Sequence, residues 1–204
     1  MAGMIFSKRV RVLAIVGLTL VAISVYAPAL AGGFVWDDQA LIVENTSIHS
    51  WTHVGDILSR DFFHLHDDPQ PYGYYRPVIT LSYLLEYHLW GLRPFGYHAT
   101  NVLLHAVSTV LVALILRRLR FGDGLCFTVA LLFAVHPIHV ENVAWIASRK
   151  DVLAFLWMTF AAARTGAGIC CVGAVAGRSR QVVAAATMRL RILSVASRCV
   201  SQVA

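Results

Sequence analysis

Long apolar runs without a single charged side chain constrain this chain more than any other feature. No Asp, Glu, Lys or Arg occurs from Val12 to Val35, and a second such run extends from Tyr97 to Leu116. About 20 apolar residues are enough to cross the hydrocarbon core of a bilayer. We therefore predict membrane-spanning helices at about 12–34, 97–116 and 121–135, and from 152 to 163 onward.

Composition also points to a membrane protein. Only 14% of the 204 residues are charged, whereas a soluble domain carries about 25%. The predicted fold class is all-α, a multi-pass helical membrane protein with a structured outer loop at 35–96. A secretory signal peptide cleaved near Ala29 or Ala31 is the alternative for the first apolar run. We favour a span, because the run is long for a signal peptide and further spans follow it.

Clusters of positive charge set the expected orientation. Basic residues lie at Lys8–Arg11 and at Arg117–Arg120, and cytoplasmic loops carry an excess of Lys and Arg. The N-terminus is therefore expected in the cytoplasm, with loop 35–96 and the connection 136–150 on the opposite side. Most of the net charge of +6 comes from these flanks and the tail. For this reason we expect the bilayer as a partner and no nucleic acid.

The composition changes abruptly near residue 163. Residues 164–204 contain six arginines but no Phe, Trp, Tyr, His, Asp, Glu or Lys. We divide the chain into a membrane part at 1–163 and a basic, low-order tail at 164–204. The tail is either a disordered cytoplasmic segment or an out-of-frame translation of a GC-rich gene. We favour the second, which makes the product truncated, and the same composition favours a bacterial inner membrane over the endoplasmic reticulum.

The outer loop 35–96 is long enough to require structure of its own. An amphipathic helix is expected between Val54 and Phe62. A further helix is predicted to begin at Pro77, since proline suits the first helical position. This helix carries Glu86, so we expect it to be interfacial or partly buried and not to span the membrane.

Two adjacent carboxylates, Asp37 and Asp38, directly follow the first span. They can cap a helix beginning near Gln39, because carboxylates accept hydrogen bonds from free backbone N–H groups. Alternatively, one removes the proton from an acceptor hydroxyl while the other binds substrate or tunes its neighbour, since touching carboxylates raise one another's pKa. Both are candidate catalytic residues. Trp36 beside them is expected at the membrane interface.

Further candidates for substrate binding lie in the outer loop and in the second span. Arg76 follows Tyr75 in a Pro-punctuated turn, and arginine suits bidentate phosphate contact; an ion pair with an aspartate is the alternative. His98, Asn101 and His105 lie at i, i+3 and i+7, so they share one helix face. Polar residues inside a bilayer face a cavity or another helix. Substrate binding and hydrogen bonding between helices both remain open for this face.

The segment "HPIHVENVAWIASRKD" is the densest group of polar residues. His136, Glu141 and Arg149 are candidates for substrate binding, and helix capping and internal ion pairing are the alternative. Histidines and carboxylates here, or in the segment 64–68, are also metal-ligand types. Neither spacing is specific for a metal, so we predict no metal residues and no firm cofactor.

Three motifs together indicate a family. The stretches "FVWDDQALIVEN", "YYRPVITLSYLLEYHLWGLRPFGYHATNVLLH" and "LLFAVHPIHVENVAWIASRKDVLA" resemble the N-terminal membrane part of the transmembrane and tetratricopeptide-repeat proteins, in the same order. That family is similar to O-mannosyltransferases of the GT-C glycosyltransferase type. The resemblance covers roughly residues 5–163. No 34-residue repeat period occurs in this chain.

The resemblance implies an activity and its substrates. A sugar, in the first place mannose, would move from a polyprenyl- or dolichyl-phosphate carrier to a Ser or Thr hydroxyl of a protein acceptor on the outer face of the membrane. In such enzymes an acidic motif in the first outer loop carries the catalytic carboxylate, and Asp37-Asp38 match it. Arg76, His136 or Arg149 would stabilise the departing lipid phosphate. Because the family has many further spans, we expect the chain to be inactive alone.

Two other classes of function compete with this one. A non-enzymatic membrane scaffold or assembly protein would use its polar residues only to hold helices together. A small transporter is disfavoured, because at most four spans are expected and no internal repeat is found.

Overall fold

The described part of the chain is helical throughout. A computed structural model describes residues 6–59 and 75–165, and no β-strand occurs within them, in agreement with the all-α prediction. The chain divides after Phe160 into two units, and the following description concerns the first. The predicted tail lies almost wholly outside the described residues, as does the segment 64–68.

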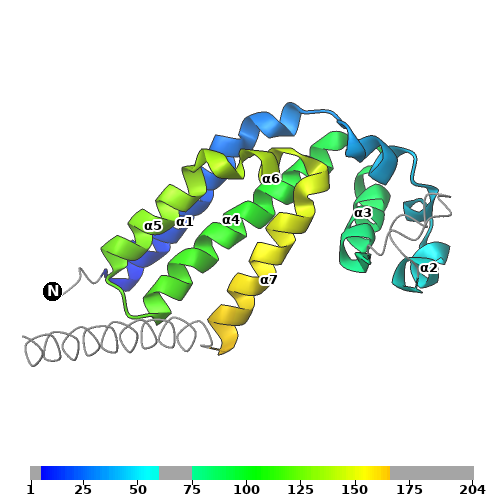
Figure 1. The fold of residues 1–204 in the computed structure, drawn as a ribbon. Coiled ribbons are helices and arrows are strands. Elements are labelled where there is room, and N and C mark those ends of the chain that lie inside the picture. The colour runs from blue at the N-terminus through cyan, green and yellow to red at the C-terminus, as the bar shows by residue number, and fades with distance from the viewer. Residues whose placement is uncertain (1–5, 60–74, 166–204) are drawn as a thin grey trace, which may run out of the picture. The chain divides into compact units, whose positions relative to one another are not determined.

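Two helical segments are long and apolar enough to cross a membrane. The first is Lys8–Ala31, in which helix α1 (Lys8–Tyr26) continues into the 3₁₀ turn η1 (Ala27–Ala31). The second is α4 (Pro94–Arg118). In Figure 1 both run along the same bundle. The prediction of a multi-pass helical membrane protein is therefore confirmed.

A third span is formed if a bent pair of helices is counted as one. Helix α5 (Asp123–Val135) is followed by the 3₁₀ turn η6 (Pro137–His139) and α6 (Val140–Ala144), with a bend of 49°. The bend has a local cause. Proline lacks a backbone N–H and forces the preceding residue into extended backbone, and His136 has φ −69° and ψ 127°.

The remaining elements belong to the outer loop and to the end of the described chain. They are η2 (Gln39–Val43, a π-helical turn), η3 (Thr46–Ile48), η4 (Trp51–His53), α2 (Val54–Ser59), α3 (Pro77–Trp90), η7 (Ile146–Ser148) and α7 (Arg149–Thr165). Helix α3 begins at Pro77 as predicted. It ends at Gly91, whose φ of +59° suits glycine because a side chain would be strained there.

The predicted boundaries of three spans need correction. The first span begins at Lys8 instead of residue 12, because the Ser7 hydroxyl caps the helix by accepting from the backbone N–H of Val10. The second begins at Pro94 instead of residue 97, since proline occupies its first turn. The fourth predicted segment begins at Arg149 as α7, which is not among the possible spans found within the described residues.

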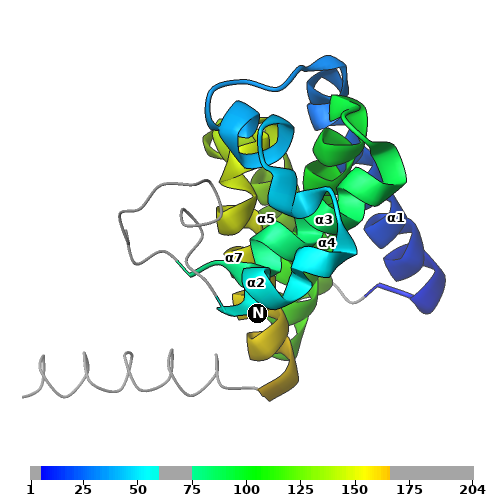
Figure 2. The same ribbon diagram turned by 90° about the vertical axis from the view of Figure 1, so that its right-hand side faces the viewer.

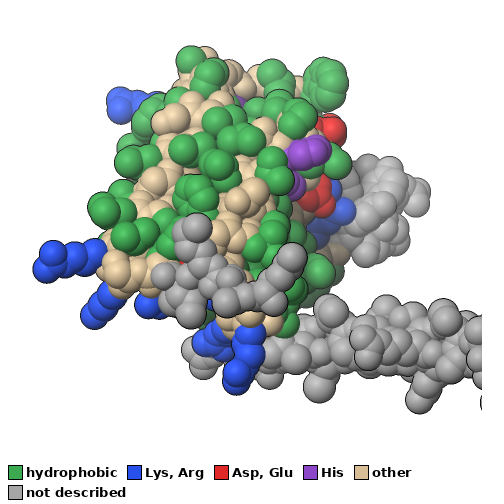
Figure 3. Space-filling view, turned by 90° about the vertical axis from the view of Figure 1, so that its left-hand side faces the viewer, with side chains coloured by type: hydrophobic (Ala, Val, Ile, Leu, Met, Phe, Trp, Pro, Cys, Tyr) green, Lys and Arg blue, Asp and Glu red, His purple; other side chains and the backbone are tan. Residues whose placement is uncertain are grey.

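Small side chains allow α1, α4 and α5 to pack closely. One layer of the bundle contains Leu18, Ala113 and Ala130, and the next consists of three alanines, one from each helix (Ala22, Ala106 and Ala134). Small residues at such contacts let helix backbones approach each other in a membrane. Hydrophobic side chains are spread over the face of this unit shown in Figure 3, with Lys and Arg side chains gathered along its lower edge. The three helices thus present apolar residues both to one another and to their surroundings.

The outer loop has a hydrophobic core of its own. Seven buried residues from four elements of the loop and from two neighbouring elements pack together: Ile42, Ile48, Ile57, Tyr83, Leu84, Tyr97 and Ile146. Figure 2 shows the short elements from η2 to α2 beside α3. Helix α3 is partly buried, as its Glu86 suggested, and the described part of the loop holds the first motif against the third.

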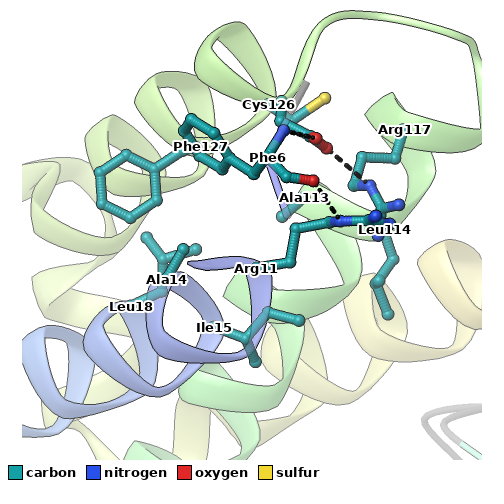
Figure 4. Close-up of a pocket in the computed structure, with 11 residues that line it drawn as sticks. Phe6, Arg11, Ala14, Ile15, Leu18, Ala113, Leu114, Arg117, Cys126 and Phe127 are labelled. Atoms are coloured by element: carbon teal, nitrogen blue, oxygen red, sulfur yellow. Dashed lines mark hydrogen bonds and ion pairs between the residues drawn. The ribbon is translucent and has the colours of Figure 1, made fainter. Parts of the chain in front are cut away.

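At the other end of the bundle, Asp123 joins the two basic clusters. Its Oδ2 accepts a hydrogen bond from the backbone N–H of Phe6 at 2.7 Å, and its Oδ1 pairs with Arg117 Nε at 2.9 Å. Arg11 Nε donates to the carbonyl oxygen of Phe6 at 3.1 Å (Figure 4). Both basic clusters therefore lie at one end of the bundle, which supports the predicted orientation.

Candidate active site

The two adjacent aspartates have opposite environments. Asp38 is fully buried, and its Oδ2 and Oδ1 accept hydrogen bonds from the backbone N–H groups of Val35 at 3.1 Å and of Ala147 at 2.8 Å. Asp37 is exposed. The helix-cap interpretation is wrong for Asp38, because its side chain makes no capping hydrogen bond to the turn that begins at Gln39.

Burial governs the ionisation of Asp38. It raises the pKa of this carboxyl, while the two backbone N–H groups and nearby His98 lower it. The charge of Asp37 contributes the smallest of these effects, a further rise. The expected mutual effect of the two carboxylates is therefore present but secondary. Asp38 is suited to hold the loop in place, whereas Asp37 is free to meet a ligand.

Trp36 adopts an unusual backbone conformation beside the aspartates. Its φ is +49°, in the left-handed region, and its side chain is 82% exposed. For a residue with a bulky side chain this conformation costs about 1–2 kcal/mol. The turn directs Asp38 inward and Trp36 outward, and the indole of Trp36 meets that of Trp145 edge to face at 5.8 Å between centroids.

The backbone from Trp145 to Ala147 is the meeting point of all three motifs. Asn101 Nδ2 donates to the carbonyl oxygen of Trp145 at 3.2 Å. The Tyr83 hydroxyl donates to that of Ile146 at 3.1 Å, and Asp38 accepts from Ala147. The first motif contributes one polar side chain (Asp38) and the second contributes two (Tyr83 and Asn101), and together they fix this backbone segment of the third motif.

Arg149 is fully buried directly after this segment. Its guanidinium pairs with Glu86 and also donates to Asn101 Oδ1 at 2.8 Å, to Ser82 Oγ at 3.2 Å and to the carbonyl oxygen of Tyr97 at 3.0 Å. Burial raises the pKa of Glu86, and the positive charge of Arg149 opposes that rise. Protein groups thus occupy each nitrogen of the Arg149 guanidinium, which places it as an internal anchor. Arg149 is therefore ion-paired, but with Glu86 of the second motif, whereas the ion pair within this segment is that of Lys150 and Asp151.

The polar face of α4 is buried, as the i, i+3, i+7 spacing predicted. His98, Asn101 and His105 are each at most 3% exposed. The ring of His98 lies against the backbone at Gly32 and next to that of Gly33 and Ala144. His105 Nε2 lies 3.3 Å from the carbonyl oxygen of Ala134, a contact between α4 and α5. Hydrogen bonding between helices is therefore confirmed for His105.

A cavity of about 160 Å³ lies deeper along α4. His105 and Ser108 line it together with His139, Asn142 and Asp151. A second cavity, of about 30 Å³, lies at the inner end near Asp123 (Figure 4). Since a water molecule needs roughly 10–15 Å³ measured in this way, the inner cavity is too small for a sugar.

The other predicted site residues lie elsewhere. The hydroxyl of Tyr75 donates to the carbonyl oxygen of Leu58 at 2.6 Å, and Arg76 is half-buried at the start of α3. His136 is exposed and its Nδ1 accepts from the backbone N–H of Ile138 at 3.2 Å, so it caps η6. Glu141 is exposed in the first turn of α6. In the described part of the chain no group of three or more His, Cys, Asp or Glu side chains could hold a metal ion.

Lys150 and Glu86 were not among the predicted site residues. Lys150 Nζ lies 5.8 Å from the ring centroid of Trp145 and 3.6 Å from Asp151 Oδ2. Glu86 is the partner of Arg149. A lone carboxylate in an otherwise apolar helix was the signal for Glu86, because a buried charge requires a partner. No signal in the sequence distinguished Lys150 from its neighbours.

Comparison with curated proteins finds relatives of this sequence. The chain is 41% identical over 134 residues to the protein O-mannosyl-transferase TMTC1 of Mus musculus, covering 64% of this chain and 14% of that protein. It is 36% identical over 137 residues to Tmtc1 of Drosophila melanogaster (67% and 16%) and 39% identical over 145 residues to TMTC2 of Homo sapiens (66% and 16%), both also named protein O-mannosyl-transferases.

The comparisons confirm the family resemblance over about two thirds of the chain. The chain spans only about one seventh of the length of these relatives. No protein-family model matches the chain, and no solved structure matches it. The relatives come from animals, so the preference for a bacterial inner membrane finds no support.

Proposed function

We propose that this chain, as a relative of the protein O-mannosyl-transferases, carries the acidic part of a glycosyltransferase active site. The enzyme would transfer mannose from a polyprenyl- or dolichyl-phosphate carrier to a Ser or Thr hydroxyl on the outer face of the membrane. One observation carries the proposal: the motif "WDD" is built as a buried anchor, Asp38, next to an exposed carboxylate, Asp37.

In this proposal Asp37 is the general base. A base must reach the proton that it removes, and Asp37 is the exposed member of the pair. The acceptor oxygen attacks C1 of the sugar, the bond from C1 to the phosphate oxygen breaks, and the hydroxyl proton passes to Asp37. The acceptor attacks on the face opposite the lipid phosphate, which leaves with the bonding electron pair, so the configuration at C1 is inverted.

Asp38 would act as a positioning residue. Its hydrogen bonds to Val35 and Ala147 fix both sides of the short turn that presents Asp37. Asn101 and Arg149 would support the same arrangement, since they hold the segment that Asp38 contacts. The role of Arg149 is therefore to place the site and not to bind phosphate.

The remaining predicted site residues are assigned roles in this proposal according to whether their side chains are exposed or buried. Arg76 and Tyr75 lie at the start of α3, and a half-buried arginine there suits phosphate contact. His136 and Glu141 are exposed next to the α5–α6 bend, and in this proposal they contact the protein that accepts the sugar. His98 is buried against the first span and supports the turn from within. The reaction as written needs no metal.

To test this, the homologous segment of the mouse relative is replaced by the matched segment of this chain, which is 64% of its length. Transfer of mannose from a short-chain mannosyl phosphate lipid to a Ser/Thr peptide is measured in liposomes. The chimera with Asp37→Asn should lose at least 100-fold in rate, because a positioned general base typically contributes 10²–10⁴-fold. Normal membrane insertion of this variant is the control.

Two outcomes of this transfer assay would contradict the proposed catalytic role. Unchanged transfer by the Asp37→Asn chimera would remove Asp37 from the mechanism. If the chimera without substitutions is inserted and folded but transfers nothing, a non-enzymatic scaffold role for this segment becomes the better explanation.

A further inference from the structure

Trp36 holds an unfavourable backbone conformation inside a hydrogen-bonded turn, in which its carbonyl oxygen accepts from the backbone N–H of Gln39 at 3.1 Å. Its φ of +49° is unfavourable for a bulky side chain, and with 82% of its surface exposed the indole gains little from burial. Strained residues of this kind cluster at ligand-binding sites, where the surrounding structure enforces them. Trp36 is also the residue immediately before Asp37. These facts make its exposed ring a candidate ligand surface.

A second indole and a cation extend this surface. Trp145 meets Trp36 edge to face, with 5.8 Å between ring centroids and 88° between the ring planes. The ammonium of Lys150 lies 5.8 Å from the Trp145 ring centroid. Its contact with Asp151, at 3.6 Å, is a solvent-exposed ion pair, which contributes little to stability and leaves Lys150 able to turn to another anion. We call Trp36, Trp145 and Lys150 the indole–lysine surface.

We propose that the indole–lysine surface binds the glycosyl phosphate of the donor, with the sugar ring on the indole of Trp36 and the phosphate at Lys150. The proposal rests on the proposed function, because it assigns the donor to the site beside Asp37. The face of an aromatic ring carries partial negative charge, and the C–H groups on one face of a pyranose carry partial positive charge, so the two stack. A lysine ammonium is a compact partner for a phosphate oxygen.

The arrangement favours a charged sugar donor over two other occupants. A tryptophan that only anchors the chain at the membrane interface does not need a left-handed backbone or a perpendicular second indole. A peptide acceptor carries no obligatory anion, so it leaves the proximity of Lys150 to Trp145 unexplained. The glycosyl phosphate uses the ring face, the cation and the position next to the base together.

Binding can be measured without any transfer reaction. The chain is reconstituted in lipid nanodiscs and titrated by calorimetry with citronellyl phosphoryl mannose and, separately, with citronellyl phosphate. Trp36→Gly should weaken binding of the mannosyl compound at least tenfold and leave binding of citronellyl phosphate within twofold. Lys150→Met should weaken binding of both compounds at least fivefold. Trp36→Phe, which keeps an aromatic face, should stay within threefold of the unsubstituted chain.

Two controls distinguish a loss of ligand binding from a loss of folding or of membrane anchoring. Glycine accepts a φ of +49°, so Trp36→Gly should keep or raise the thermal midpoint, and a loss of binding is then not a loss of folding. Trp51→Ala removes another exposed indole of the outer loop, and it should leave both affinities unchanged. If Trp36→Gly and Trp51→Ala weaken binding equally, Trp36 is a membrane anchor and the proposal is wrong.

The result is independent of the transfer assay. Absence of mannosyl-lipid binding by the unsubstituted chain, or equal binding by Trp36→Gly, overturns the indole–lysine surface whatever the chimera does. Conversely, binding that depends on Trp36 and Lys150 supports it even if Asp37→Asn leaves transfer unchanged.

Discussion

Asp38 and Ala147, which are 109 positions apart in the sequence, are joined by a hydrogen bond of 2.8 Å from the Ala147 backbone N–H to Asp38 Oδ1. This contact attaches the turn after the first span to the segment before α7. Because the same carboxylate also accepts from Val35, one buried side chain fixes both sides of the turn that exposes Trp36 and Asp37. The placement of the candidate base thus depends on its buried neighbour.

Replacing Asp38 should cost stability, whereas replacing Asp37 should not. Asp38→Ala leaves the buried N–H of Ala147 without its acceptor, which costs about 1–3 kcal/mol. The matched variant Asp37→Ala changes an exposed side chain and should stay within about 0.5 kcal/mol. Denaturant titration of the chain in detergent micelles compares the two. Equal losses for both variants would contradict the division of roles between anchor and base.

The pair of Arg149 and Glu86 should be sensitive to the loss of either partner alone. Arg149→Met leaves the Glu86 carboxylate buried without a counter-charge, and breaking a buried pair in this way costs about 3–5 kcal/mol. The double variant Arg149→Met, Glu86→Leu should recover part of that loss, because it removes both charges. Thermal unfolding of the single and double variants provides the measurement.

Lys150→Met is the matched control for this pair, since it removes a neighbouring cation that is partly exposed. The thermal unfolding midpoint of the Lys150→Met variant should change little. A double variant that is no more stable than Arg149→Met alone would show that the ion pair is not the source of the loss.

The stability of the protein should fall as pH rises through the range in which Asp38 titrates. Burial raises the pKa of Asp38 above its ordinary value of 3.8, so between the two values the folded state binds more protons than the unfolded state. The free energy of unfolding then decreases with rising pH and levels off above the folded pKa. Asp38→Asn removes this contribution, so its stability relative to the unsubstituted chain should improve from pH 4 upward. A difference that is constant with pH would contradict the raised pKa.

The two ends of the bundle should face opposite sides of the membrane. Gly33 and Gly124 lie near the two ends, and a side chain added at either position meets open space. With the four native cysteines replaced by serine, Gly124→Cys should react with an impermeant maleimide in sealed microsomes, whose outer surface is cytoplasmic. Gly33→Cys should react only after permeabilisation. The reverse pattern would overturn the orientation that the basic clusters predict.

The sequence by itself predicted the elements that depend on local composition. Apolar runs identified helices α1 and α4, and Pro77 marked the start of α3. The spacing of His98, Asn101 and His105 predicted a shared buried face. These predictions succeeded because bilayer thickness, helix periodicity and proline geometry act within one segment of the chain.

Boundaries were predicted less well, for reasons that are also local. Ser7 caps the first helix within its basic flank, and Pro94 begins the second helix three residues before the predicted start at residue 97. Caps and first-turn prolines extend helices into residues that a hydropathy pattern leaves out.

Only the tertiary structure decided which polar residues serve the fold and which remain free. Asp37 and Asp38 are chemically identical and adjacent, yet one is exposed and the other is tied to Ala147. Arg149 and Lys150 are likewise adjacent cations, of which Arg149 is wholly enclosed and Lys150 lies beside Trp145. The anchoring roles of Asp38 and Arg149 depend on Ala147 and Glu86, 109 and 63 positions away, and a sequence does not fix such distances until its helices have packed.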